Sequence, residues 1–205
     1  MRILGLTGSV GMGKSTAAAM FRRMGVPVFD ADAAVHAMLA PGGSAAGEVA
    51  REFPGVIAAG GVIERRALGA KVFGDRIALA RLERILHPRV AEAERRFVKR
   101  ARAARRSLVV LDVPLLFESG GDRRCDAVVV VWAPPHIQRE RVLKRPGMNT
   151  ARLAFIRAQQ TSEREKRRRA DFLVPSGLGR APTWRALRRV VRAMRAKAMA
   201  SLKPA

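Results

Sequence analysis

Short apolar runs alternate along the chain with longer segments in which apolar residues recur every three or four positions. Short runs bounded by turn residues are typical of buried strands, whereas the longer period is typical of amphipathic helices. The pattern predicts about five strands, in the ranges 2–6, 26–30, 107–118 (interrupted at Pro114), 126–135 and 170–175. Strands that alternate with helices indicate an α/β fold, with a parallel sheet flanked by helices.

Two segments exceed what a simple strand–helix–strand connection needs. The segment 33–105 is long and largely helical, so it predicts an inserted helical subdomain. The segment 136–169 reads as a helix, a turn and a helix rich in arginine, as in the lid that excludes water from phosphoryl-transfer sites. We therefore expect a single domain with a core (1–32, 106–135 and 170–205), a helical insert (33–105) and a lid (136–169).

Composition narrows the class of protein. No apolar run approaches the roughly 18 residues that cross a bilayer. The lone Cys125 cannot form an internal disulfide, which favours a cytoplasmic protein. The net charge of +23 has three interpretations: nucleic-acid binding, attraction of small polyanions, or a merely solvated surface. We favour the third and expect no specific nucleic-acid partner, because aromatic residues are few and tyrosine is absent.

The most specific signal is the stretch GSVGMGKS at 8–15, which satisfies the phosphate-binding P-loop pattern. An apolar strand precedes it and a helix is predicted over 14–24, so backbone N–H groups and the helix N-terminus would face a phosphate. The alternative is a glycine turn that only joins strand to helix. The predicted nucleotide-binding residues are Gly8, Gly11, Met12, Gly13, Lys14, Ser15 and Thr16.

Two carboxylates follow the second predicted strand. Asp30 and Asp32 point to the same side if the strand conformation continues through them. A kinase needs a group that orients or deprotonates the acceptor hydroxyl, and Asp32 is our candidate, with Asp30 in support. The alternative is that either residue caps the helix that follows.

The magnesium and phosphate ligands follow from the same comparison with kinases. Ser15 and Asp112, which ends an apolar strand, are the predicted magnesium ligands, whereas Glu118 is a weaker candidate. Lys14 would contact the terminal phosphates. Arg141 and Arg145 lie four residues apart on a predicted helix, so both would reach phosphate from one face, more convincingly than the basic run 166–169.

Several motifs together resemble the dephospho-CoA kinase family. The P-loop is followed in order by VPVFDADAAVHAML, ERRALGAKVF, LERILHPRV, LDVPLLFESG and RADFLVPSG. The likeness runs from residue 1 to about 177 and is far more specific than the P-loop alone.

The resemblance implies transfer of the γ-phosphoryl group of ATP, with magnesium, to the ribose 3′-hydroxyl of dephospho-CoA. It implies that Asp32 is the base, that the helical insert (33–105) binds the acceptor, and that Arg65 and His87 belong to this acceptor-binding insert. For His87, a helix-capping or packing role is the alternative. The chain departs from many relatives at Ser9, a frequent glycine, at Pro146 in the lid, and at LVPSG after the last strand.

Two rival functions remain at this stage. One is a P-loop kinase for another small alcohol or nucleotide. The other is a nucleic-acid-associated ATPase that uses the basic helix predicted over 183–202, which has an apolar stripe opposite its arginines. The sequence predicts no oligomeric state.

Overall fold

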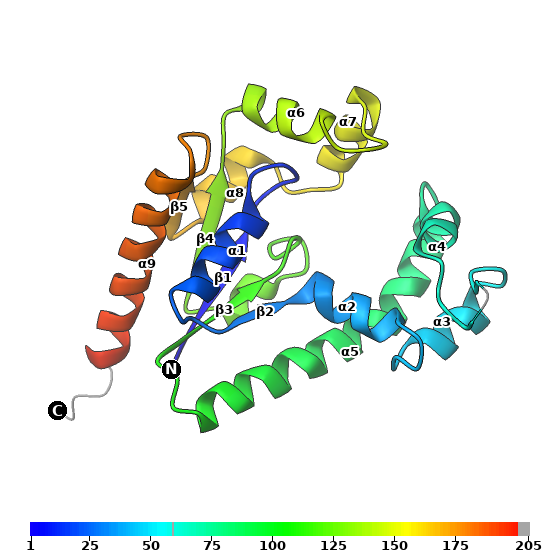
Figure 1. The fold of residues 1–205 in the computed structure, drawn as a ribbon, viewed down its shortest axis with the longest axis horizontal. Coiled ribbons are helices and arrows are strands. Elements are labelled where there is room, and N and C mark those ends of the chain that lie inside the picture. Colours follow the sequence, from blue (N-terminus) through cyan, green and yellow to red (C-terminus); the bar gives the residue numbers. More distant parts are fainter. Residues whose placement is uncertain (59, 201–205) are drawn as a thin grey trace. The chain divides into compact units, whose positions relative to one another are not determined.

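Five strands pair side by side in the order β2–β3–β1–β4–β5 (Figure 1). The structure is a computed structural model that describes residues 1–58 and 60–200. The strands are β1 (Arg2–Thr7), β2 (Val28–Asp30), β3 (Leu108–Asp112), β4 (Ala127–Trp132) and β5 (Phe172–Pro175). β1 pairs in parallel with β3 and β4, and β4 pairs in parallel with β5. The predicted α/β fold with a parallel sheet is confirmed.

The valine-rich strand β4 is central and buried on both faces, as its composition indicates. Val129 and Val131 face one core, where they meet helices α1 (Lys14–Arg23) and α9 (Arg180–Ala200). Val128 and Val130 face the other core, which includes Leu116 and Phe117 from the turns after β3. Alternate side chains of this strand therefore contribute to the apolar cores on both faces of the sheet.

Helix α9 packs along α1 and the sheet. The predicted apolar stripe is confirmed, because Leu187, Val191 and Met194 are buried in the core and Trp184 packs against it. This packing accounts for the stripe without a nucleic-acid partner. Ser201 and Leu202, at the end of the predicted helix, lie outside the described residues.

The predicted lid segment contains three helices instead of two. They are α6 (Pro135–Leu143), α7 (Thr150–Ala158) and α8 (Glu163–Arg169). Asn149 and Ser162 begin the second and third of these by accepting hydrogen bonds from the backbone N–H groups of Arg152 and Glu165. Among the residues that the structure describes, no helix is long and apolar enough to cross a membrane.

The chain divides into two compact units. Residues 30–99 form the second unit, and residues 1–29 belong to the first together with the chain that follows Lys99. It contains α2 (Ala31–Leu39), α3 (Ala46–Glu52), α4 (Arg65–Val72) and most of α5 (Arg76–Ala103). These helices enclose an apolar core of their own around Val49, Val56 and Ile85.

Candidate nucleotide site

The P-loop backbone takes a form that only glycine adopts without strain. Gly11 and Gly13 have φ angles of 78° and 89°, in the left-handed region. A Cβ atom on Gly8 would lie 2.6 Å from the carbonyl oxygen of Val131 on β4. The loop is therefore folded tightly between β1 and the first residue of α1, Lys14, with its N–H groups in a turn suited to an anion.

Lys14 and Asp112 form an ion pair with 2.7 Å between Nζ and Oδ1. The register of β1 and β3, which sets Leu6 beside Asp112, brings the carboxylate to the edge of the sheet where the P-loop begins. The Asp112 side chain is only 3% exposed. Two residues that sequence patterns placed in one site thus lie in direct contact, while Ser15 is exposed on the first turn of α1.

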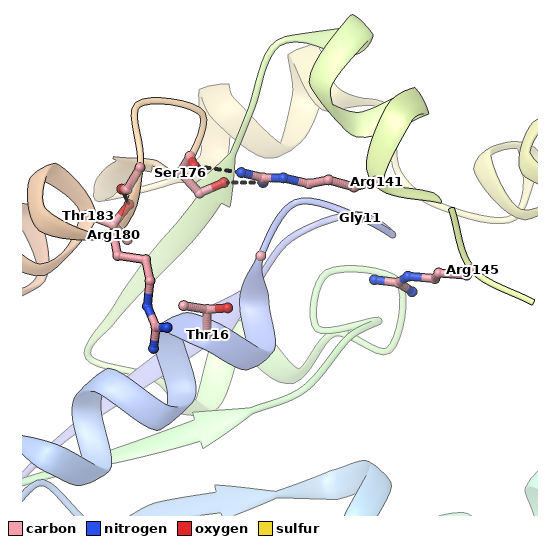
Figure 2. A pocket seen from close by; sticks show the side chains of 9 residues that line it. Gly11, Thr16, Arg141, Arg145, Ser176, Arg180 and Thr183 are labelled. Atoms are coloured by element: carbon pink, nitrogen blue, oxygen red, sulfur yellow. Dashed lines mark hydrogen bonds between the residues drawn. The ribbon is translucent and has the colours of Figure 1, made fainter. Parts of the chain in front are cut away.

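A cavity of about 310 Å³ opens beside the loop (Figure 2). The structure brings the predicted residues Gly11, Gly13 and Thr16 to this cavity together with Arg141 and Arg145. Its remaining lining residues come from the segment after β5 and from α9: Ser176, Gly179, Arg180 and Thr183. The cavity is thus rich in positive charge and suits a nucleotide phosphate.

Arg141 and Arg145 reach the cavity differently from the prediction. Helix α6 ends at Leu143, so Arg145 lies beyond the helix, and the expectation that both residues share one helical face is wrong. Pro146 explains the early end, because a proline disfavours helical backbone in the residue before it. Both side chains nevertheless line the cavity.

Ser176 holds Arg141 in place, and sequence reasoning did not single it out. The Arg141 guanidinium donates to the Ser176 Oγ at 3.0 Å and to its carbonyl oxygen at 2.8 Å (Figure 2). Ser176 Oγ in turn donates to the carbonyl oxygen of Met12 in the P-loop, at 2.7 Å. The departure at LVPSG was the available signal: the serine after the last strand joins α6 to the phosphate loop.

Replacing Ser176 with alanine is expected to raise the KM for ATP about fivefold to tenfold. The change removes one hydrogen bond to a charged group and the Met12 contact, while the main-chain contact to Arg141 remains. Steady-state kinetics with varied ATP would measure this. Ser176→Thr keeps a hydroxyl and should retain most of the affinity; an unchanged KM in the alanine variant would contradict the role.

Asp30 and the predicted site residues Asp32, Arg65 and His87 lie in the second unit. Asp30, not Asp32, is the N-cap of α2: its Oδ1 accepts from the backbone N–H of Ala33 at 3.0 Å. β2 ends at Asp30, so strand alternation does not extend to Asp32, which is exposed in the first turn of the helix. The capping alternative therefore holds for Asp30 and is wrong for Asp32.

Arg65 and His87 are both exposed in this unit. Arg65 is the first residue of α4, and His87 lies within α5 next to Pro88. Because the imidazole is exposed and lies inside the helix, not at its end, the structure supports neither the packing nor the helix-capping alternative for His87. The functional roles of Asp32, Arg65 and His87 stay predictions.

The weaker candidate Glu118 is held by hydrogen bonds and an ion pair. Its Oε1 accepts from the backbone N–H of Thr161 at 2.6 Å and lies 3.3 Å from the Nζ of Lys166. Burial works to raise the pKa of Glu118, but the Thr161 amide, its own amide and the Lys166 charge together lower it below the ordinary value. Glu118 is thus bound to α8 and to the chain just before it, and its weaker candidacy as a magnesium ligand stays a prediction.

A P-loop between strand and helix, an arginine-lined cavity beside it and the helices α6, α7 and α8 after β4 define a P-loop kinase. The family model for dephospho-CoA kinase matches residues 2–177. A dephospho-CoA kinase of Rhodospirillum rubrum is 58% identical over 186 residues, which cover 91% of this chain and 88% of the relative. The chain belongs to the dephospho-CoA kinase family.

Solved structures agree in fold. A protein from Thermus thermophilus superposes with a TM-score of 0.80 at 34% identity, covering 99% of this chain and 98% of that one. A dephospho-CoA kinase from Campylobacter jejuni gives a TM-score of 0.65 at 21% identity, covering 94% and 97% of the two chains. The family assignment confirms the resemblance read from the motifs and makes the protein an ATP-using kinase. It does not favour the two rival functions.

Proposed function

We propose that this kinase transfers the γ-phosphoryl group of ATP to the ribose 3′-hydroxyl of dephospho-CoA, giving coenzyme A and ADP. The observation that carries the proposal is the family match over residues 2–177, which spans the P-loop, the helical insert and the lid segment alike. Identities near 58% with a named dephospho-CoA kinase support the same acceptor.

The roles of the basic residues follow from their positions. Lys14 belongs to the P-loop motif and is the first residue of α1, so it would contact the terminal phosphates as a point charge. Arg141 and Arg145 line the cavity and would bind phosphate oxygens with planar guanidinium groups. Such a site accelerates transfer by positioning and by stabilising charge, because the transition state requires little covalent help.

Ser15 and Asp112 fit a magnesium ion. Mg²⁺ is commonly held by one or two protein groups plus substrate phosphates, and a hydroxyl with a carboxylate provides such a pair. Among the described residues, no group of three or more His, Cys, Asp or Glu side chains could hold a metal on its own, which agrees with this mode. Bound magnesium would neutralise part of the phosphate charge.

Acceptor binding is assigned to the second unit by resemblance to the family. Asp32 would accept or orient the proton of the 3′-hydroxyl, and Arg65 and His87 would contact dephospho-CoA. All three side chains are exposed, as contact with a substrate requires.

The direct test is to mix the protein with Mg·ATP and dephospho-CoA and to follow the products by mass spectrometry. We expect the acceptor to gain the mass of one phosphoryl group and ADP to appear in equal amount. Other nucleosides and small alcohols serve as control acceptors and should stay unmodified. ATP consumption without coenzyme A would refute the acceptor assignment and leave the nucleotide site standing.

A further inference from the structure

Lys166 is the one basic side chain that is fully buried among those the structure describes, with 0% exposure. It lies in α8 next to three exposed arginines, Arg167, Arg168 and Arg169. Removing an ammonium group from water is costly unless it gains compensating partners. The burial of this one lysine costs free energy that the exposed arginines beside it do not cost, so its position requires a structural explanation.

The partners of Lys166 connect it to the phosphate-binding loop. Its Nζ donates to the Oγ of Ser9, at 3.2 Å, and lies 3.3 Å from Oε1 of Glu118. Ser9 is the second residue of the P-loop motif and is itself buried. A buried charge from the lid segment thus contacts the loop directly.

Glu118 also binds the chain just before α8. Its Oε1 also accepts from the backbone N–H of Thr161, in the connection between α7 and α8. Lys166 and Thr161 are therefore bound to the same carboxylate, one on the helix and one just before it. The arrangement fixes the start of α8 relative to the turns that follow β3.

The next P-loop residue, Val10, is held by two more side chains of the lid segment. Gln138 on α6, itself buried, donates to the Val10 carbonyl oxygen at 2.8 Å. The Val10 N–H donates to the Oε1 of Gln160 at 3.4 Å. Side chains from α6, the α7–α8 connection and α8 therefore all contact the Ser9–Val10 half of the loop.

Movement of Ser9 would be passed on to the phosphate-facing half. The backbone N–H of Met12 donates to the carbonyl oxygen of Ser9 at 3.1 Å, so the two halves of the turn are bonded. Gly13 and Lys14 follow Met12 directly.

We propose that Lys166 is a positioning residue that sets nucleotide affinity through Ser9, a role that rests on the proposed function only in that the P-loop binds ATP. Its buried ammonium group fixes the Ser9–Val10 half of the loop in the conformation that receives phosphate. Glu118 holds the ammonium group in place. Lys166 touches no substrate; it acts through the loop.

Calorimetric titration of ATP into the full-length protein tests this without any acceptor. Lys166→Met keeps an unbranched chain of similar size and removes the charge, and we expect it to weaken ATP binding about tenfold. In steady-state assays the KM for ATP should rise likewise, while the KM for dephospho-CoA stays within about twofold. Lys144→Met, which removes an exposed lysine from the end of α6, is the matched control and should bind ATP normally.

A double-mutant cycle separates positioning from mere stability. If Lys166 acts through Ser9, then Ser9→Ala should weaken ATP binding on its own and add little to Lys166→Met. Fully additive effects, or a lowered melting temperature with normal ATP affinity, would overturn the proposal. If Lys166→Met does not fold, Ser9→Ala decides alone, and an unchanged affinity in that variant refutes the role. If the unaltered protein binds ATP but forms no coenzyme A, only the assignment of dephospho-CoA as the acceptor is refuted.

Discussion

Replacement of Lys14 by alanine is expected to lower kcat/KM for ATP by about 10³-fold, the scale found when one preorganised charge-stabilising group is removed from an active site. Lys14 stands at the N-terminus of α1, where it adds a full charge to the loop's N–H groups. Magnesium and the arginines would remain, so a residual rate should persist. Initial rates of coenzyme A formation, measured by mass spectrometry over a range of ATP concentrations, give the value.

The Lys14 variant needs a stability control. The change deprives the buried Asp112 carboxylate of the ion pair at 2.7 Å, so the melting temperature should fall as well. Rates are therefore compared at a temperature at which both proteins are folded, with Lys144→Ala as a lysine variant on the surface. A Lys14→Ala protein that is folded and within tenfold of normal activity would show that the lysine does not stabilise the transferred group.

Replacement of Asp32 by asparagine is expected to reduce kcat about 10²- to 10⁴-fold while leaving ATP affinity nearly intact. Asparagine has the same shape and still accepts a hydrogen bond, but it cannot take up a proton. Asp32 is exposed in the first turn of α2 and is not its cap, so folding should tolerate the change. Turnover at saturating dephospho-CoA and calorimetric titration of ATP give the two quantities.

The structure offers a matched control in the same short segment. Asp30→Asn also neutralises a carboxylate, yet asparagine is as good an N-cap as aspartate. This variant should keep turnover close to normal. If Asp32→Asn turns over normally, or if the two variants lose activity equally, Asp32 is not the base.

The strands and the phosphate loop were predictable because their signals are local. The valine run of β4 and the glycine–lysine pattern of the P-loop each contain their own physical reason within a few residues. Helix ends were harder: Pro146 ends α6 before Arg145, and Asp30 rather than Asp32 caps α2, although both candidates were visible in the sequence.

The parts of the site that sequence reasoning missed depend on contacts between distant segments. Ser176 bonds to Met12, and Lys166 bonds to Ser9, across separations of 164 and 157 residues. A serine after a strand and a lysine in a basic run have no local pattern that distinguishes them from surface residues. Only the fold, which brings α8 and the end of β5 to the P-loop, gives them partners.

The cavity beside the P-loop is lined partly by residues from two segments that lie far apart in the sequence, Gly11–Thr16 and Ser176–Thr183. Bringing together segments so far apart costs loop-closure entropy, and the cavity exists only when both segments are folded in place. ATP should therefore bind the completely folded chain and not a partly folded intermediate. Bound nucleotide should therefore raise the melting temperature of the sheet and α9 together, and should not protect the P-loop alone.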